Sequence, residues 1–432
     1  MKEMPHANIS PREVLRGFKQ DRLGFIQKLI NQYGSVFSLS LKPHKAIIMM
    51  NPDMINHILS SHKDNYIKGT HVQGSSFHFL KAALGDSIFI TDDKALWAKH
   101  RRIVMPHLQR SKYNEYAKAI ISNGNEMITR WQNTQETRIN ISEAIPELTL
   151  RNLLNSIFNE KNFDFDTLLE FTYLMKANDR HKSFKTLITI FDKLVSDFIL
   201  RRMNQLTSKD DLVNSFTEAY QNEQEQSIVF NLIRNELKGL LIAGHETIAG
   251  SIIWSCYLLA QDPEAQLKIK TEFDAISAQH RPTYDDIAKL TFTSTVFKES
   301  LRLYPPIYVI SRVAVADDHC DGFIIPKDAI VMIPIFQLQR AEEYWDQPEK
   351  FKPERFSNVP FPEETYPAYM PFGVGQRACI GREYAAMEAC LTLGMIFSTF
   401  QFSLPHDYQL ALNAENSLWP KSPLQLIIQK KW

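Results

Sequence analysis

The loop at positions 371–381, with the sequence PFGVGQRACIG, constrains this chain more than any other segment. It places one thiol, Cys379, among three glycines and directly before the helix-prone run 382–389. A cysteine before a helix feels the positive end of the helix dipole, which favours the thiolate. Glycines permit tight turns and the close approach of a flat ligand, and loop amides can then donate to the sulfur. Because Arg377 adds a fork of donors suited to a carboxylate, we predict a loop that holds haem through Cys379.

The spacing Phe-Gly-x-Gly-x-Arg-x-Cys-x-Gly at 372–381 resembles the haem-binding loop of the cytochrome P450 family, and every fixed position is filled. The resemblance implies haem b as the cofactor and Cys379 as the ligand of its iron. The loop residues that it implies as haem contacts are Phe372, Gly373, Arg377, Cys379 and Gly381. A free cysteine is more often an inert, small apolar residue. We interpret Cys256 and Cys390 in that way, because each lies in an apolar helical run.

The periodicity of the chain predicts a mainly helical protein with a small β-rich region. Residues 11–34 have the pattern of one helix that ends at Gly34, and most of 52–300 has helical periodicity. Strand patterns occur at about 35–50, 309–333 and 402–430. The resemblance implies the cytochrome P450 fold, as a single domain over residues 1–432.

Composition excludes several classes of protein. Hydrophobic residues make up 44% and charged residues 23%, which is ordinary for a globular chain and not for a disordered or collagen-like one. A net charge of zero argues against a general nucleic-acid binder. Four cysteines without paired spacing fit a reducing cytoplasm. No apolar run near the start suits a signal peptide or a membrane span, and nothing follows Trp432. We therefore expect a soluble, cytoplasmic monomer without a fused reductase.

A second motif predicts a buried ion cluster. Glu299 and Arg302 lie three apart, so they share one face of a helix. In the P450 family such a pair is joined by the arginine of a Pro-Glu-Arg-Phe segment, which stands here at 353–356 and contains Arg355. We expect these three residues to hold the core together and not to act in catalysis. One departure is Gln339-Arg340, where the family often has His-Arg.

A third set of residues matches the family's sites for the haem propionates. Trp97 and Arg101 lie four apart in a predicted helix, so an indole donor and a guanidinium share one face. The resemblance implies that this pair holds one propionate and that Arg312 holds the other. His100 is an open case, because it either reaches the haem or faces solvent.

The segment Ala243-Gly244-His245-Glu246-Thr247 resembles the oxygen-activation signature of P450s and lies in an apolar helix. Two glycines, Gly244 and Gly250, weaken such a helix unless another group comes close, and we expect O₂ there. Thr247 can return its hydroxyl to the carbonyl of Ala243 and open a groove in the helix. Thr247 and Glu246 are therefore the predicted catalytic residues, with Ala243 against the haem.

The activity that the resemblance implies is monooxygenation of an apolar substrate such as a fatty acid, a terpenoid or a steroid-like molecule. O₂ would be the oxidant, and a ferredoxin or flavodoxin with its reductase would supply two electrons. A basic cluster suits such an acidic partner: Lys94, Lys99, His100, Arg101, Arg102, Arg110 and Lys112. Two alternatives stay open: a peroxide-driven haem-thiolate enzyme, which the intact pair of Glu246 and Thr247 disfavours, and a haem-based sensor.

The predicted substrate pocket is apolar. Its candidate residues, by likeness to the family, are Phe77, Phe79, Leu80, Ala243, Ile307, Val309, Ile310 and Leu424. P450s normally roof this pocket with two long helices. Here the corresponding segments are short, at 165–175 and 184–203 with a polar break between them. We therefore expect a shortened roof and a wide channel mouth near 160–190.

Overall fold

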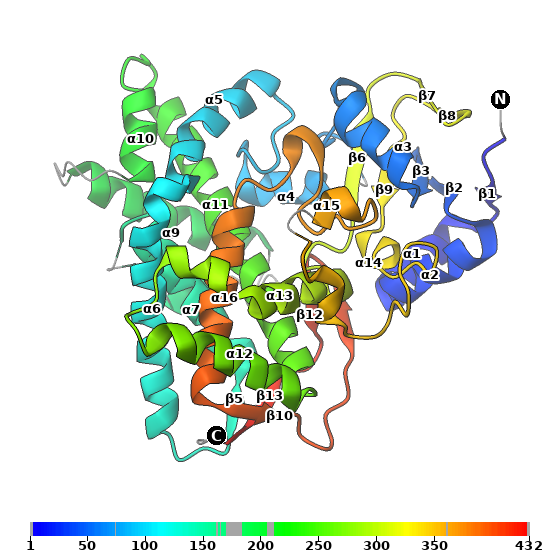
Figure 1. Cartoon of the computed structure of the whole chain (residues 1–432). Coiled ribbons are helices and arrows are strands. Elements are labelled where there is room, and N and C mark those ends of the chain that lie inside the picture. Colours follow the sequence, from blue (N-terminus) through cyan, green and yellow to red (C-terminus); the bar gives the residue numbers. More distant parts are fainter. Residues whose placement is uncertain are drawn as a thin grey trace.

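The computed structural model describes residues 3–73, 75–160, 163–164, 166–169, 184–204, 211–359 and 362–429. Figure 1 shows the long helices gathered on one side of the molecule and most of the strands, with short helices around them, on the other. The long helices are α5 (Lys94–Val104), α6 (Arg110–Asn133), α7 (Ile141–Ser156), α9 (Phe184–Asn204), α11 (Gln226–Leu259), α12 (Pro263–Ser277), α13 (Thr291–Leu303) and α16 (Arg382–Thr399). The shorter ones are α1 (Pro11–Gln20), α2 (Arg22–Tyr33), α3 (Pro52–Asn56), α4 (Ser76–Leu84), α10 (Leu212–Ala219), α14 (Ile335–Leu338) and α15 (Pro362–Thr365).

The largest sheet has six strands in the order β1 (His6–Ala7), β2 (Val36–Leu41), β3 (His44–Met49), β9 (Ile330–Ile333), β6 (Ile310–Ala314) and β4 (Tyr66–Ile67). A three-stranded sheet joins β10 (Gln401–Ser403), β13 (Gln425–Gln429) and β5 (Arg138–Asn140). Two hairpins complete the strands: β7 (Asp318–Cys320) with β8 (Phe323–Ile325), and β11 (Leu412–Ala414) with β12 (Leu418–Pro420). The large sheet therefore brings the chain near residue 312 next to segments from the first third of the sequence.

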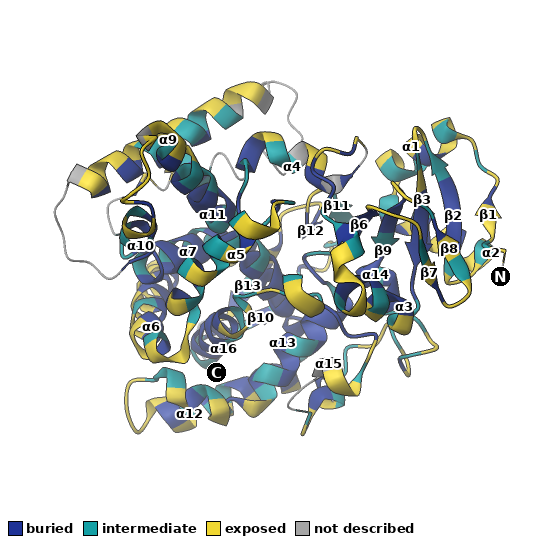
Figure 2. Cartoon of the chain, turned by 90° about the horizontal axis from the view of Figure 1, so that it is seen from above, coloured by how far each residue is buried: buried dark blue, intermediate teal, exposed yellow. Residues whose placement is uncertain are grey.

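The helix α11 forms the centre of the helical part and packs against α7, α9, α13 and α16. In Figure 2 the buried residues concentrate where α7, α11, α13 and α16 meet. Both α11 and α16 are apolar around most of their circumference, and such a helix is stable only when other elements surround it. The loop that precedes α16 is thereby held close to the middle of the molecule.

The predicted mixture of a helical majority and a small β-rich region is confirmed, with strands in all three predicted ranges. The prediction of one helix over 11–34 is wrong. Asp21 interrupts it with a non-helical backbone (φ −154°, ψ 85°), and its carboxylate caps α2 by accepting a hydrogen bond from the amide of Gly24. The second predicted roof helix, 184–203, is present as α9. The first roof segment and the break after it lie largely outside the described residues, so the shortened roof stays a prediction.

Candidate active site

The cysteine loop turns sharply because two of its glycines adopt a backbone conformation that other residues avoid. Gly373 and Gly375 have φ of +66° and +73°. A Cβ atom at Gly375 would also overlap the carbonyl oxygen of Leu59. The turn is closed by the amide of Cys379, which donates to the carbonyl of Phe372 at 2.9 Å. The loop thus brings Phe372 and Cys379 side by side, ahead of α16.

Cys379 differs from the other three cysteines, because it is exposed and they are buried. Burial nevertheless raises the pKa of the Cys379 thiol, so protein atoms surround it closely. The amide of Gly381 donates to the sulfur and, with the charge of Arg382, lowers the same pKa. The thiolate expected from the helix dipole therefore requires a cation beside the sulfur, and a bound metal ion supplies one.

Buried cations gather on the side of the loop that carries Arg377. Arg312, 6% exposed, lies on β6 and donates to the carbonyl of its neighbour Ser311. The guanidinium of Arg377 lies over the Trp97 ring at 4.4 Å, and that of Arg101 lies over the same ring at 5.4 Å. Burial lowers the pKa of Arg312 and that of Arg377 to about 10, and a neighbouring arginine charge adds to this effect in each case, whereas the carboxylate of Asp92 opposes it.

Two residues that the sequence analysis missed complete this cluster. The ammonium of Lys68 lies 4.3 Å from the Phe77 ring, and burial, together with Arg312 and Arg377, lowers its pKa. Asp92 supplies a carboxylate to the cluster, but this carboxylate already accepts hydrogen bonds from three backbone amides, those of residues 68–70. Lys68 and Asp92 lie 24 residues apart and match no short motif, so only the fold brings them together.

The residues present fit a haem with two carboxylate groups. The Nη1 atom of Arg377 is buried without a hydrogen-bond partner in the part of the chain that the structure describes. Arg312, Arg377 and Lys68 face a hollow of about 40 Å³ that Trp97 and Asp92 also line. Three partly or fully buried cations beside one occupied carboxylate are costly without further anions. Two propionates would remove this imbalance.

The middle of α11 has the local geometry that the sequence predicts. The hydroxyl of Thr247 donates to the carbonyl of Ala243 at 2.9 Å. Ala243 and Thr247 are partly accessible, whereas their neighbours Leu241, His245 and Ile248 are buried. This face of the helix therefore borders open space. Gly244 is partly accessible as well, and a Cβ there would lie 3.0 Å from the side chain of Leu153 on α7. This glycine therefore permits close packing of the two helices, and the approach of O₂ there stays a prediction.

Glu246 is held by the hairpin of β11 and β12, which the sequence analysis did not connect with it. Ser417, between the two strands, donates to the carboxylate of Glu246 at 2.7 Å. The indole of Trp419 donates to the hydroxyl of Ser417 at 2.8 Å. The carboxylate is partly accessible, and a chain of hydrogen bonds fixes its direction.

Both ring nitrogens of His100 pair with residues other than Trp97 and Arg377. Its Nδ1 lies 2.7 Å from the carboxylate of Glu236 on α11, and its Nε2 lies 2.7 Å from the hydroxyl of Tyr220. All three side chains are buried. The ring offers no free donor to a haem, and it does not face solvent either. We therefore leave His100 out of the haem-binding set.

The candidate pocket residues fall into two groups. Phe77 packs edge-on against Phe89 at 6.2 Å, and Leu80, Ile307, Val309 and Ile310 are partly accessible. Ile310 also lies beside Gly373 of the cysteine loop. Leu424, in contrast, is fully buried in the main core, and its amide donates to Ser142. It does not line an open space. The side chain of Phe79 lies outside the described residues.

The predicted ion cluster is confirmed. The carboxylate of Glu299 pairs with Arg302 at 2.7 Å and with Arg355 at 3.3 Å, and Glu299 and Arg302 are fully buried. Gln339 stands where the family often has histidine. Its amide group donates to the carbonyls of residues 301 and 302 and accepts from the amide of Met370. Gln339 therefore ties the end of α13 to the segment that leads into the cysteine loop.

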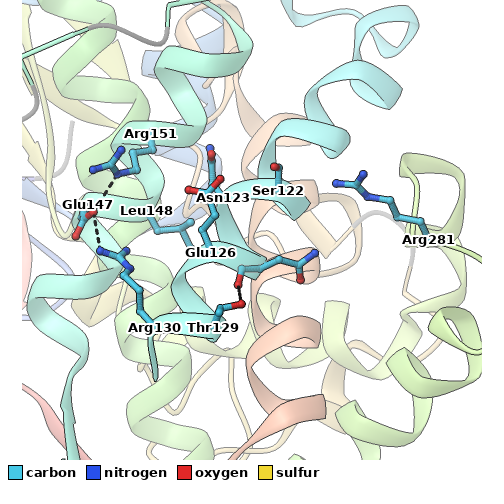
Figure 3. A pocket seen from close by; sticks show the side chains of 10 residues that line it. Ser122, Asn123, Glu126, Thr129, Arg130, Glu147, Leu148, Arg151 and Arg281 are labelled. Atoms are coloured by element: carbon cyan, nitrogen blue, oxygen red, sulfur yellow. Dashed lines mark hydrogen bonds and ion pairs between the residues drawn. The ribbon is translucent and has the colours of Figure 1, made fainter. Parts of the chain in front are cut away.

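A wide surface hollow of about 820 Å³ lies elsewhere, between α6 and α7 (Figure 3). Its lining is polar and charged, with Glu147 paired to Arg130 and Arg151. None of the candidate site residues lines it. It is therefore not the candidate active site.

Known proteins resemble this chain over most of its length. The family model described as "Cytochrome P450" matches residues 14–227 and 148–428. "Protein LUTEIN DEFICIENT 5, chloroplastic" of Arabidopsis thaliana is 29% identical over 88% of this chain and 69% of its own length. "Carotene epsilon-monooxygenase, chloroplastic" of the same plant is 25% identical over 94% of this chain and 81% of its own. "Cytochrome P450 4F4" of Rattus norvegicus is 28% identical over 95% and 86%.

The chain belongs to the cytochrome P450 family. It is accordingly an oxidoreductase of the monooxygenase type, and its family implies a haem cofactor. Within the described residues no helix combines the length and the apolar character that crossing a bilayer requires.

Proposed function

We propose that this P450 hydroxylates or epoxidises an elongated apolar substrate, with haem b held by Cys379 and with electrons from a separate ferredoxin or flavodoxin. The observation that carries the haem site is the exposed residue Cys379 in a sharply turned loop, with the amide of Gly381 donating to its sulfur. Haem, when bound, supplies the oxygen chemistry, which a thiolate ligand favours. Arg312, Arg377 and Lys68 would hold its carboxylates, with Trp97 and Arg101 beside them.

The protein's own contribution to catalysis would be proton delivery. The Thr247 hydroxyl donates its hydrogen to Ala243, so its oxygen presents acceptor lone pairs to the open side of α11. The carboxylate of Glu246, one residue earlier, is oriented by Ser417 and can exchange protons with solvent. This pair favours an O₂-dependent enzyme over the peroxide-driven and sensor alternatives, which need no such relay.

The substrate class rests on the lining and on the relatives. The candidate pocket residues are apolar, and the side chain of Ile310 lies beside Gly373 of the cysteine loop. One relative is named as a monooxygenase of carotene, a long terpenoid. Among fatty acids, terpenoids and steroid-like molecules we therefore favour a long terpenoid. Cytoplasmic location and a monomeric state remain part of the proposal.

An optical titration of the haem-loaded protein tests the substrate class. We expect long terpenoids to shift the haem absorption by displacing water, with half-saturation at lower concentrations than for steroids of similar hydrophobicity. Ile310→Asp should weaken this response, because it places a charge among apolar side chains. Val315→Asp, an exposed position close by in sequence, is the control. A preference for steroids, or an unchanged titration of Ile310→Asp, would contradict the proposal.

A further inference from the structure

Three metal-binding side chains meet outside the haem site. His57, His62 and Asp318 each offer one ligand atom, and these atoms lie within 4.8 Å of one another. They come from two parts of the sequence, the turn that follows α3 and the strand β7. Neither the family match nor the proposed function assigns a role to this group.

The backbone brings the two histidines together through a rare conformation. Residues His57–Ser61 form a π-helical turn, η1, and the amide of His62 donates to the carbonyl of His57 at 2.8 Å. In an α-helix, residues five apart point about 140° away from each other. In this turn their rings stack, with centroids 3.7 Å apart and planes 18° apart. Turns of this kind are uncommon and frequently occur at functional sites.

Hydrogen bonds hold the carboxylate of Asp318 in place, as is usual for a carboxylate that binds a metal ion. Its Oδ2 lies 2.8 Å from Nε2 of His57 and accepts a hydrogen bond from the hydroxyl of Tyr66 at 2.7 Å. Its Oδ1 accepts from the amide of His319 at 2.8 Å. Outer hydrogen bonds of this type orient metal ligands and raise affinity. The carboxylate therefore needs no large rearrangement to bind a cation.

The geometry also suits entry and coordination of an ion. Ligand atoms around a tetrahedral zinc ion lie roughly 3.4 Å apart. The ligand atoms here lie within 4.8 Å of one another, and a rotation of the exposed ring of His62 can bring them closer together. The side chains of His57 and Asp318 are 19% and 12% exposed, so the group lies at the surface.

We propose that His57, His62 and Asp318 bind one divalent transition-metal ion of the zinc class, with solvent as the remaining ligand. The set of two imidazoles and one carboxylate matches the ligands that such ions prefer. This inference does not depend on the substrate or on the redox partner of the enzyme.

The proposed metal site lies next to the cysteine loop, so a bound ion should affect that loop. The carbonyl of Leu59, inside the same π-turn, contacts Gly375 of the cysteine loop. Leu59 and Ile58 also line the small hollow beside Arg312 and Arg377. A metal ion that fixes the turn should therefore make the surroundings of the loop more rigid and raise the temperature at which haem is lost.

Zinc titration of the haem-loaded, chelator-treated protein tests the site. We expect one Zn²⁺ per chain by calorimetry, and zinc-edge X-ray absorption should show nitrogen and oxygen ligands at about 2.0–2.1 Å. His62→Phe keeps a ring stacked on His57 but removes the ligand atom, and it should weaken binding roughly tenfold or more. His280→Ala is the matched control, because His280 pairs with Asp286 at 2.8 Å but belongs to no group of three ligand residues in the described part of the chain.

Two results would overturn the inference. The first is a calorimetric titration in which the wild-type protein binds no Zn²⁺. The second is a His62→Phe variant that binds Zn²⁺ as tightly as the wild type. Retained zinc affinity in Asp318→Asn together with His62→Phe would show that the ion binds at other histidines. Because calorimetry reports the ion and not turnover, failure here leaves the P450 activity untouched.

Discussion

At the scale of the residue, one carboxyl group stands in an unusual environment. Glu388 lies fully buried in α16, where Asn152 donates to it at 2.8 Å. Burial raises its pKa from an ordinary 4.5 to about 8, although hydrogen bonds from Asn152 and Tyr384 act in the opposite direction. Between these two pH values the folded protein keeps a proton that the unfolded chain releases.

This proton predicts a pH dependence of stability. Because the folded pKa is the higher one, the stability that the neutral carboxyl provides is lost as pH rises from about 4.5 to about 8. The loss reaches at most about 1.4 kcal/mol per pH unit. Glu388→Gln keeps the neutral shape and removes the titration. Denaturant unfolding at about pH 5.5 and about pH 7.5 should therefore show a smaller pH effect in this variant. Equal pH effects in both proteins would contradict the assignment.

Site features that involve only residues close together in the sequence can be predicted from the sequence. The turn around Cys379 and the bond from Thr247 to Ala243 each involve a few consecutive positions, so a short motif encodes them. His100 is the opposite case. Its partners Glu236 and Tyr220 lie 136 and 120 residues away, and no local pattern distinguishes a buried network from a haem contact.

At the scale of the element, the contact between α11 and the hairpin of β11 and β12 predicts how protons reach the site. Thr247→Ala should keep haem and substrate binding but divert electrons from product to hydrogen peroxide, lowering product per NAD(P)H roughly tenfold or more. Ser417→Ala removes the donor that orients Glu246 and should give a smaller loss of the same kind. The measurement is product formed per NAD(P)H consumed.

A hydroxyl on the same helix provides the control for this prediction. Ser255 donates to the carbonyl of Ser251 at 2.8 Å, as Thr247 does to Ala243, but it is fully buried two turns further along. Ser255→Ala should leave the product yield unchanged. If Thr247→Ala behaves like Ser255→Ala, protons reach the site by another route.

Helices and strands were predicted correctly where the apolar periodicity extends over many residues. The prediction was wrong where a single residue determines the end of a helix. The apolar run of α11 and the alternation of β2 extend over many residues, and both were predicted. The break at Asp21 depends on a single capping carboxylate within an otherwise continuous helical pattern. The strands β4 and β5 have two and three residues and exist through pairing with β6 and β13, which a local window cannot detect.

At the scale of the whole molecule, charge does not single out the expected docking face for a redox partner. The chain is neutral overall. Several members of the basic cluster near α5 are paired, Lys94 with Asp64, Lys99 with Glu223 and Arg110 with Glu383. Arg102 is exposed at the end of α5. Ion pairs at the surface reduce the electrostatic field that could steer a redox partner. The structure therefore supports docking at this face less strongly than the sequence alone does.

The central claim is that Cys379 binds the haem iron, and one spectrum tests it most directly. The reduced wild-type protein with carbon monoxide should show the red-shifted main band that thiolate ligation gives to P450s. Cys379→Ser should lose this band while the protein stays folded by circular dichroism. The buried cysteines give matched controls, so Cys256→Ser and Cys390→Ser should keep it. A normal band in Cys379→Ser would contradict the account.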